Sequence, residues 1–274
     1  MDTRRADLHT HTRYSDGLLT PAELVARAHA AGISALAVTD HDSIDGLPEA
    51  MAAGSELGIE VVSGVELSVT AGGQEIHLLG YGFDAANQGL KAHLDRFRDV
   101  RMRRGRAIVE ALNGLGIPLA MEDVLAFARD GVVGRPHVAK ALVKRRLVAS
   151  YEDAFARYLC DEGPAFVAKP LFPALQGIAL IHAAGGLAVL AHPGTRVEGE
   201  VIQQLIRAGL DGIETIHPSH SSALTRRYED LAHRYGLLET GGSDYHGLRS
   251  EEDHNFVRYS IPYRRVELMR RAAA

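Results

Sequence analysis

Residues 6–42, ADLHTHTRYSDGLLTPAELVARAHAAGISALAVTDHD, contain a complete strand–helix–strand unit and indicate the fold class. Residues 6–9 predict the end of a short strand. Thr20 is placed to cap the helix that follows, and Glu23 completes a capping box three residues later. Residues 34–39 (SALAVT) form a mostly apolar run that predicts a buried strand. Strands joined by a helix are typical of a parallel sheet with crossover helices.

The same alternation occurs in two parts of the chain, separated by a helical stretch. Helices are expected over 46–57, 173–184, 200–209 and 221–235, and strands over 59–65, 187–191, 212–216 and 237–240, with a hairpin over 66–82 and a last strand and helix at the end. Between them, helices are expected over 88–115, 120–130, 136–148 and 151–162. The sequence therefore predicts an α/β barrel built from residues 1–95 and 170–274, interrupted by a helical insertion at 96–169.

The composition is that of an ordinary globular protein that is rich in histidine. Of 274 residues, 46% are hydrophobic and 24% charged, and 14 are histidine. A single cysteine, Cys160, excludes a disulfide framework and a cysteine-rich zinc site. No apolar run approaches the roughly 18 residues of a membrane span, and the N-terminus has no apolar stretch of signal-peptide type. A cytoplasmic protein without membrane contact is expected, and no protein partner can be identified from the sequence.

Positive charge is concentrated in the predicted insertion. Residues 96–169 carry 14 basic and 9 acidic side chains, a net charge of +5, whereas the rest of the chain has a net charge of −10. A basic segment on an acidic body favours an anionic substrate. The alternative is a solvated helical face, and the sequence leaves both open.

Histidine and carboxylate side chains recur where the predicted strands end, which is where α/β barrels build their active sites. His9 and His11 are two apart on extended chain and point the same way. The others are Asp16, Asp40, His41, Asp42, Glu66, His77, His192, Asp244 and His246. One such histidine is more often structural than a metal ligand, but so many ionisable groups need partners. A multi-metal cluster accounts for them together.

In this order, the motifs resemble those of the PHP (polymerase and histidinol phosphatase) family. They are DLHTH at 7–11, YSDG at 14–17, TDHD at 39–42, GVE at 64–66, His77, AHP at 191–193 and GSDYH at 242–246. The resemblance covers both predicted barrel segments. It implies a distorted (βα)₇ PHP barrel that carries three divalent metal ions beyond the carboxyl ends of its strands.

The resemblance also implies which residues hold the three metal ions. The first ion would be held by His9, His11, Glu66 and Asp244, the second by Glu66, His77 and His192, and the third by Asp16, His41 and His246. Nitrogen and oxygen ligands without thiolate fit Mn²⁺, which is expected first, and also Fe or Zn²⁺. Three carboxylates against three divalent ions leave positive charge for a hydroxide and a phosphate group. Asp7 is expected to orient a ligand histidine, and Asp42 either does the same or caps a helix.

The insertion contains a candidate phosphate clamp. Gly134-Arg135-Pro136-His137 precedes a predicted helix, so that Arg135 and His137 would bind a phosphate near the helix N-terminus. The alternative for Arg135 is a salt bridge between insertion and barrel. The element resembles the branch of the family that removes phosphate from nucleoside 3′,5′-bisphosphates, some of whose members trim short RNA. About half of the neighbouring arginines, Arg101, Arg103, Arg104 and Arg106, are expected to be solvated.

Residues 217–221 (HPSHS) follow another predicted strand and should open towards the same face. Ser219 and Ser221 are candidates for donating to a substrate phosphate, although one of them could serve as a helix cap. His217 or His220 is a candidate general acid for the leaving oxygen. A purely orienting role for these histidines is the alternative.

Four functions are compatible with these features. The first is a metal-dependent phosphatase in which a metal-held hydroxide attacks the 3′-phosphate of a nucleoside 3′,5′-bisphosphate. Here the insertion clamps the 5′-phosphate and excludes a continuing strand. The second is a 5′-3′ exoribonuclease or oligonucleotide phosphodiesterase acting on short RNA. An acidic body with only 9 Tyr, 7 Phe and no Trp disfavours a long stacking channel.

The other two functions explain less of the sequence. A histidinol-phosphate-type phosphatase leaves the GRPH element unexplained. A non-enzymatic metal-binding module is disfavoured by the complete ligand set. The sequence therefore predicts an enzyme that acts on a small nucleotide substrate.

Overall fold

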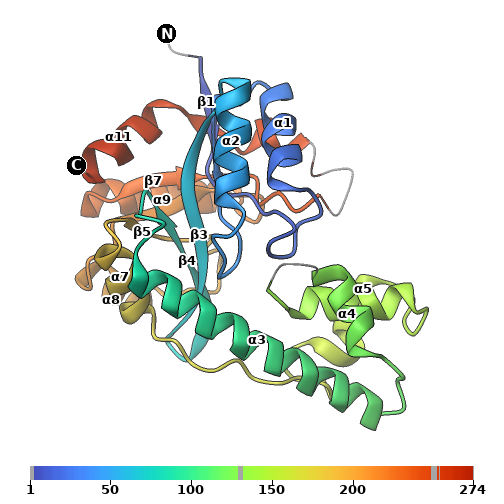
Figure 1. The fold of residues 1–274 in the computed structure, drawn as a ribbon. Coiled ribbons are helices and arrows are strands. Elements are labelled where there is room, and N and C mark those ends of the chain that lie inside the picture. The colour runs from blue at the N-terminus through green and yellow to red at the C-terminus, as the bar shows by residue number, and fades with distance from the viewer. Residues whose placement is uncertain (1–2, 129–131, 248–251, 253, 274) are drawn as a thin grey trace.

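Eight strands form one sheet that curls into a nearly closed barrel (Figure 1). The computed structural model describes residues 3–128, 132–247, 252 and 254–273. The strands are β1 (Arg5–Asp7), β2 (Ala35–Val38), β3 (Glu60–Ala71), β4 (Gln74–Tyr81), β5 (Leu187–Leu190), β6 (Gly212–Ile216), β7 (Leu238–Gly241) and β8 (Ile261–Pro262), in the spatial order β7-β6-β5-β4-β3-β2-β1-β8. Leu8 N donates to Gly241 O at 3.1 Å, which joins β1 to β7 and closes the barrel.

The barrel combines parallel and antiparallel pairing, and the antiparallel strands are β4 and the short β8, which pairs with β1. Strand β4 is antiparallel to both β3 and β5, whereas β1, β2 and β3 pair in parallel, as do β5, β6 and β7. The third strand is longer than the predicted 59–65, because the hairpin partner β4 continues to pair with it up to Ala71. Pairing with β2 ends at Ser63. Glu66 therefore lies within β3, just beyond the point at which pairing with the parallel strand β2 ends.

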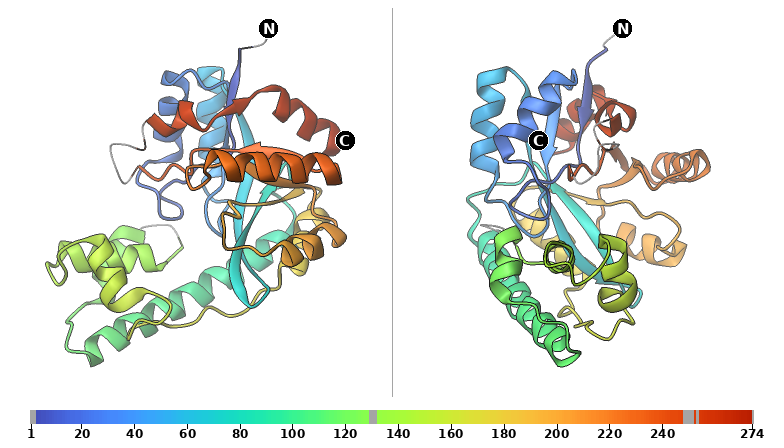
Figure 2. Two further views of the ribbon diagram at one scale, coloured as in Figure 1. Left: turned by 180° about the vertical axis from the view of Figure 1, so that it is seen from behind. Right: turned by 90° about the vertical axis from the view of Figure 1, so that its right-hand side faces the viewer.

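Helices pack around the outside of the sheet, as the alternating pattern predicts (Figure 2). They are α1 (Pro21–Ala30), α2 (Leu47–Leu57), α7 (Ala174–Ala183), α8 (Gly199–Arg207), α9 (Ser222–Tyr235), α10 (Asn255–Arg258) and α11 (Arg264–Ala273). The predicted capping box of α1 is present, with the Thr20 side chain accepting from Glu23 N at 3.1 Å and Thr20 N donating to Glu23 Oε2 at 2.8 Å. The main core joins these helices to the outer face of the sheet, with Leu24, Leu36 and Ile178 fully or almost fully buried.

A second core lies inside the barrel. It is built from small and branched side chains of the strands, including Ala6, Ala37 and Val189, and is extended by Val266 and Met269 of α11. This packing fills much of the barrel interior with apolar side chains. None of the described helices is both long and apolar enough to cross a membrane.

The segment between β4 and α7 is helical and projects from the barrel (Figure 1). It contains α3 (Gln88–Gly114), α4 (Met121–Ala128), α5 (Arg135–Lys144), α6 (Tyr151–Ala154) and a π-helical turn, η1 (Phe155–Leu159). The predicted end of the second helix, at 129–130, lies outside the described residues. The predicted helix over 151–162 is shorter, because the π-helical turn ends it at Leu159.

Helix α3 connects the main core of the barrel to a separate hydrophobic cluster in the helical segment. Its first turns belong to the barrel, since Leu90 and Leu94 lie in the main core and the His93 ring lies 4.1 Å from that of Phe172. Its later turns belong to a separate cluster that includes Ile108 and Leu112 together with residues of α4, α5 and η1. The far half of α3 therefore positions these helices beyond the carboxyl edge of the barrel.

Candidate metal centre and its two cavities

The nine predicted ligands come together at the carboxyl edge of the barrel. His9 and His11 follow β1, His41 follows β2, His192 follows β5, and Asp244 precedes His246 in the loop after β7. Glu66 and His77 come from the paired strands β3 and β4. Backbone contacts hold the loops in place: Thr39 N donates to Thr10 O at 2.8 Å, and Asp244 N donates to His9 O at 2.9 Å. The strand ends therefore place side chains from distant parts of the chain around one point.

Glu66 is the centre of this arrangement and is fully buried. Its Oε1 lies 2.8 Å from His77 Nδ1 and 2.9 Å from His192 Nε2. Its Oε2 lies 2.9 Å from His41 Nδ1, 3.3 Å from His11 Nε2 and 3.4 Å from His9 Nε2. One carboxylate thus faces five imidazoles, which is the geometry of a bridging ligand.

Asp16 and Asp244 provide two further carboxylates. Asp244 Oδ1 lies 3.1 Å from His11 Nε2 and 3.4 Å from His9 Nε2. Asp16 Oδ1 lies 3.1 Å from His246 Nε2, and Asp16 Oδ2 lies 4.0 Å from His41 Nε2. The donor atoms fall into overlapping groups, in which His41 faces both Asp16 and Glu66 and His11 faces both Asp16 and Asp244. His192 and Asp244 adopt φ values of 22° and 51°, a backbone conformation that is often found at functional sites.

The charges of the cluster favour bound cations. Burial opposes ionisation of Glu66, yet the imidazoles of His41, His77 and His9 hold the pKa of its carboxyl well below its usual value. The pKa values of Asp16 and Asp244 are held well below the usual value against burial in the same way, chiefly by His246 and by His9 respectively. Burial itself lowers the pKa of His11 to about 3, so this imidazole is neutral and has a free lone pair.

The donor set fits divalent metal ions. Within the described part of the chain, His9 Nε2, His11 Nε2, His41 Nδ1, Asp16 Oδ1 and Glu66 Oε2 are buried and have no hydrogen-bond partner. Buried polar atoms without partners destabilise a fold unless a ligand satisfies them. Imidazole nitrogen and carboxylate oxygen are ligands for Mn²⁺, Fe and Zn²⁺, so the choice among these ions stays a prediction.

Glu214 is a supporting residue that the sequence analysis missed. It lies in β6 and is fully buried, with Oε1 3.0 Å from His9 Nδ1 and Oε2 accepting from His192 N at 2.7 Å. A carboxylate on the second ring nitrogen orients a ligand histidine and fixes its tautomer. A signal was available, because a glutamate within an otherwise apolar strand (GIETI, 212–216) needs a buried partner.

Asp7 and Asp40 support the backbone of the site. Asp7 was expected to orient a ligand histidine, but its Oδ1 accepts from the backbone N–H groups of His9 (3.2 Å) and Ser243 (3.0 Å), and among the described residues it forms no hydrogen bond with an imidazole. Burial raises the pKa of Asp7 to about 7. Asp40 accepts from Thr12 N at 2.7 Å and from Ser15 Oγ at 2.6 Å. Both aspartates therefore hold the loops that carry the ligands.

Asp42 has a different role from either of those expected. Its Oδ1 accepts from Ser68 N at 2.8 Å, and its Oδ2 is paired with the guanidinium of Arg101 from α3. Both side chains are buried. Asp42 thus connects the barrel to the helical segment rather than orienting a ligand or capping a helix.

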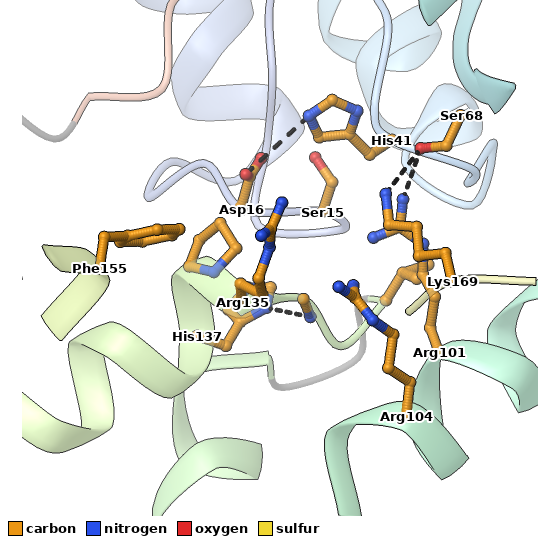
Figure 3. Close-up of a pocket in the computed structure, with 13 residues that line it drawn as sticks. Ser15, Asp16, His41, Ser68, Arg101, Arg104, Arg135, His137, Phe155 and Lys169 are labelled. Atoms are coloured by element: carbon orange, nitrogen blue, oxygen red, sulfur yellow. Dashed lines mark hydrogen bonds and ion pairs between the residues drawn. The ribbon is translucent and has the colours of Figure 1, made fainter. Parts of the chain in front are cut away.

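A cavity of about 200 Å³ lies between the metal cluster and the helical segment (Figure 3). We call it the cationic cavity; it is lined by Ser15, Asp16, His41, Ser68, Arg101, Arg104, Val132, Gly134, Arg135, Pro136, His137, Phe155 and Lys169. Arg101 and Arg104 are only 6% and 7% exposed, whereas Arg103 and Arg106 are exposed. The sequence did not show which of these arginines are solvated. The orientation of α3 about its axis determines which of them are buried.

The four cations of this cavity have different partners. Lys169 Nζ lies 2.6 Å from Glu75 Oε1, Arg135 NH1 lies 2.6 Å from Asp161 Oδ1, and Arg101 is paired with Asp42. Arg104 donates to the carbonyl of Val167 at 2.6 Å and, among the described residues, has no carboxylate partner. Burial, together with the charges of Arg135 and Arg101, lowers the pKa of Arg104 to about 10, so it remains a cation at neutral pH.

The GRPH element lies on the wall of the cationic cavity. Arg135 points into it, as Figure 3 shows, and its acidic partner Asp161 belongs to the helical segment rather than to the barrel. The alternative of a salt bridge to the barrel is therefore not what the structure shows. His137 Nδ1 accepts from Gly134 N at 3.0 Å, and burial lowers the pKa of this imidazole to about 4. His137 is thus neutral and shapes the turn that begins α5.

A second cavity of about 380 Å³ lies on the other side of the cluster. Its lining comprises Gln74, Glu75, Ile76, His77, Ala191, His192, Pro193, Gly194, Thr195, Arg196, Val197, His217, Ser219, Leu224 and Asp244. None of these residues belongs to the helical segment 96–169. We expected the insertion to exclude an RNA strand that continues past the scissile phosphate. The insertion does not line this second cavity, so it does not close the cavity to such a strand.

Residues 217–221 lie at the edge of this second cavity. Ser221 caps α9, with its Oγ accepting from Leu224 N at 3.3 Å, so it takes the capping role that was one of the two alternatives. His220 Nδ1 faces Thr215 O at 3.0 Å, and its Nε2 accepts from Gly194 N at 3.1 Å. Both ring nitrogens of His220 are thus engaged by the backbone, which favours an orienting role over proton transfer.

His217 contacts the cluster directly. Its Nδ1 accepts from Ser219 N at 3.0 Å and lies 2.7 Å from Ser219 Oγ, while its Nε2 lies 3.3 Å from Asp244 Oδ2. With Nδ1 accepting, the ring proton belongs on Nε2 and is donated to Asp244. This arrangement favours orientation of Asp244 by His217.

The chain is similar to known proteins over most of its length. The PHP domain model matches residues 7–159. The chain is 38% identical over 249 residues to a 5′-3′ exoribonuclease of Haemophilus influenzae, with 89% of this chain and 90% of that protein covered. It is 37% identical over 246 residues to a 3′,5′-nucleoside bisphosphate phosphatase of Chromobacterium violaceum, with 88% and 86% covered. A solved structure from Bifidobacterium adolescentis, described as a candidate metal-dependent phosphoesterase, matches with a TM-score of 0.85 at 33% identity, covering 89% of this chain and 88% of that one.

Proposed function

The chain belongs to the PHP domain family of metal-dependent phosphoesterases, and on that basis we propose that it removes the 3′-phosphate from nucleoside 3′,5′-bisphosphates. The products would be a nucleoside 5′-monophosphate and inorganic phosphate. Of the two relatives described above, one is a phosphatase of 3′,5′-nucleoside bisphosphates and the other is a 5′-3′ exoribonuclease.

The observation that carries this proposal is the cationic cavity next to the metal cluster. A single phosphate at the cluster would not account for Arg104, a buried cation that lines the cavity and has no acidic partner among the described residues, nor for the three further cations gathered around it. Guanidinium groups bind phosphate through charge-assisted hydrogen bonds. A volume of about 200 Å³ suits a phosphate group rather than a whole nucleotide. The site is thus suited to a substrate with two phosphates, of which only one reacts.

The metal ions would be held by the nine cluster residues His9, His11, Asp16, His41, Glu66, His77, His192, Asp244 and His246. When bound, divalent ions lower the pKa of water and stabilise the charge of a phosphoryl group, which is the chemistry that phosphoester hydrolysis needs. Three ions, with Mn²⁺ first among the candidates, are part of the proposal.

The side chains of the protein bind and orient the substrate. Arg104, Arg101 and Lys169 would hold the 5′-phosphate, and Arg135 would join them by exchanging Asp161 for the substrate. This places the leaving 3′-oxygen near Asp16 and His41, because these two cluster residues line the cationic cavity. His217 and Ser219 lie on the opposite side, so we assign them to the orientation of Asp244 rather than to protonation of the leaving oxygen.

A histidinol-phosphate-type activity is less compatible with these contacts. Histidinol phosphate has one phosphate and an ammonium group, so its cationic end would have to face a cavity that is already rich in positive charge. A short 5′-phosphorylated RNA, in contrast, presents the same two phosphates as the bisphosphate.

A turnover panel with added Mn²⁺ tests the proposal. The substrates are a 3′,5′-bisphosphate, a 5′-monophosphate, a 5′-phosphorylated dinucleotide and histidinol phosphate, and the readout is kcat/KM for each. We expect the bisphosphate to be hydrolysed with release of the 5′-monophosphate, and the 5′-monophosphate to be left intact. Faster turnover of histidinol phosphate than of the bisphosphate would contradict the proposal.

A further inference from the structure

We infer that the second cavity is the subsite for the nucleotide that follows the scissile phosphate of a short 5′-phosphorylated RNA, and that Arg196 at its edge contacts the next phosphate. The inference rests on the proposed function, because it takes the 5′-phosphate in the cationic cavity as its starting point. It assigns to this chain a defined place for the leaving strand.

The order of groups along such a substrate matches the order of the two cavities. The cationic cavity contacts the cluster through Asp16 and His41, whereas the second cavity contacts it through His77, His192 and Asp244. No residue lines both cavities. They adjoin at the cluster, where the ring centroids of His41 and His77 are 5.0 Å apart, and at the pair of Lys169 and Glu75, whose Nζ and Oε1 are 2.6 Å apart. A chain with its 5′-phosphate in the first cavity and its next phosphate at the cluster must continue into the second.

The second cavity has the size and lining of a nucleoside site. At about 380 Å³ it falls within the range of about 300–1,000 Å³ that is typical of sites for small organic ligands. Ile76, Pro193 and Leu224 supply apolar surface for a base, and Gln74 and Thr195 supply polar groups for a ribose. This mixed lining contrasts with the cationic lining of the first cavity.

Arg196 is the only arginine or lysine that lines the second cavity within the described chain. Its side chain is exposed and forms no hydrogen bond or ion pair with the residues that the structure describes, whereas Arg101, Arg135 and Lys169 are all paired with carboxylates. Its backbone carbonyl accepts from Gln74 Nε2 at 3.0 Å, which connects its loop to β4. A guanidinium at this edge can bind the phosphodiester beyond the second nucleoside.

The reaction in this arrangement is a balanced hydrolysis. The oxygen of water bonds to phosphorus, the bond between phosphorus and O3′ of the first nucleotide breaks, and O3′ takes up a proton. The products are a nucleoside 5′-monophosphate and an RNA that is one nucleotide shorter. Because the shortened RNA retains the phosphate as its new 5′ end, it is again a ligand for the cationic cavity.

The test compares two substrates in four proteins with added Mn²⁺. The proteins are the wild type, Thr195→Trp, which fills the second cavity, Arg196→Ala, and the control Arg207→Ala, an exposed arginine of α8 that lines neither cavity. The substrates are a 3′,5′-bisphosphate and a 5′-phosphorylated RNA trinucleotide. We expect Thr195→Trp to lower kcat/KM for the trinucleotide about tenfold or more, because the indole would occupy space that the second nucleoside needs, and to leave the bisphosphate within about twofold.

A binding measurement separates this inference from the proposed activity. The probe is a trinucleotide with a methylene group in place of the scissile 3′-oxygen, and its Kd is measured as a function of salt. For Arg196→Ala, the slope of log Kd against log salt should fall by about 0.7, the value for one phosphate contact on a single strand, and Arg207→Ala should keep the wild-type slope.

The outcomes distinguish the two proposals. If Thr195→Trp and Arg196→Ala change neither trinucleotide turnover nor binding while the wild type hydrolyses the bisphosphate, the inference is wrong and the proposed function stands. An equal loss on both substrates also overturns the inference, because the cavity would then serve the bisphosphate itself. If trinucleotide binding weakens in the variants but no protein hydrolyses the bisphosphate, the subsite is supported and the phosphatase proposal fails.

Discussion

Arg104 differs from its neighbours in the cationic cavity because no carboxylate balances its charge among the described residues. Arg101, Arg135 and Lys169 each share their charge with an acidic partner, whereas the hydrogen bond that Arg104 forms within the described chain goes to the carbonyl of Val167. A phosphate that enters the cavity therefore gains most from Arg104.

We predict that Arg104→Ala lowers kcat/KM for a 3′,5′-bisphosphate about 10- to 150-fold. The reason is the loss of a charge-assisted hydrogen bond to the phosphate that does not react, about 1.5–3 kcal/mol. The matched control is Arg103→Ala on the exposed side of the same helix, which should be unchanged. A nucleoside 3′-monophosphate lacks the 5′-phosphate, so a similar loss on that substrate would show that Arg104 does not bind this group.

Glu214 should control metal affinity without being a ligand. Replacement by Gln removes the charge that faces His9 Nδ1, and changes of this kind typically weaken metal binding about 10- to 100-fold. Titration of the metal-free protein with Mn²⁺ measures this directly. Glu239→Gln on the neighbouring strand β7 is the control, because Glu239 pairs with Arg265 and contacts none of the cluster residues by ion pair. Equal Mn²⁺ affinity in the wild type, Glu214→Gln and Glu239→Gln would refute the role of Glu214 in metal binding.

At the level of the secondary-structure elements, the buried pair Asp42–Arg101 attaches α3 to the barrel. The two side chains are 59 positions apart in sequence, and both are buried. Although burial opposes it, the charges of Arg101 and Lys169 hold the pKa of Asp42 below its usual value. The position of the helical segment over the metal cluster therefore depends on an ionised Asp42.

We predict that Asp42→Asn lowers the free energy of unfolding by about 3–5 kcal/mol, because Arg101 is left as a buried charge without a counterion. Denaturation by urea measures the loss. The double variant Asp42→Asn, Arg101→Met should recover part of it, since it removes both charges. If the double variant is less stable than Asp42→Asn alone, the uncompensated charge is not the cause.

The same pair predicts a pH dependence with a defined sign. A depressed pKa of Asp42 in the folded state means that the pair stabilises the fold above the usual pKa of about 3.9 and that this contribution is lost as the pH falls through the lower, folded value. The difference in unfolding free energy between wild type and Asp42→Asn should thus be constant from pH 7 to about pH 5 and shrink under more acidic conditions. A difference that grows on acidification would contradict this interpretation.

For the molecule as a whole, the cluster couples metal binding to stability. Its atoms come from strands on all sides of the barrel, so ions that bind the folded state must stabilise the entire barrel rather than one loop. At free Mn²⁺ about 1,000 times its Kd, linkage gives about 4 kcal/mol. We predict that a chelator lowers the Tm by several degrees while the circular dichroism of the protein below the transition stays that of a folded α/β barrel. An unchanged Tm after verified metal removal would show that the cluster does not bind ions in the folded protein.

Much of the barrel and the candidate ligand set could be predicted from the sequence, because the information is local. The capping box at Thr20 and the alternation of strands and helices are properties of neighbouring residues. Most ligand candidates could be listed because they follow strands, and parallel strands end at one edge whatever their order in the sheet. Glu66 and His77 instead lie within the paired strands β3 and β4, and the resemblance to the PHP family selected the nine residues. His9 and His11 needed only the two-residue period of extended chain to be placed on one side.

The remaining features depend on contacts between distant residues. The rotation of α3 about its axis buries Arg101 and Arg104 and exposes Arg103 and Arg106, and this rotation is set by packing against the barrel and the other helices. Glu214 lies 205 residues from His9, so no local pattern links them. The extension of β3 past Val65 depends on the pairing partner β4.

The division of the site into two cavities was decided only by the tertiary structure. The motifs at 7–11, 39–42, 191–193 and 242–246 specify which side chains meet, because they end or follow strands that end at the same edge, and the motif at 64–66 places Glu66 within β3 at that level. They do not specify which ligands face the helical segment and which face the loop after β5, since that depends on how far the far half of α3 extends over the cluster. The sequence therefore identifies the side chains of the candidate metal centre. The packing of α3 determines which residues line the space on each side of that centre.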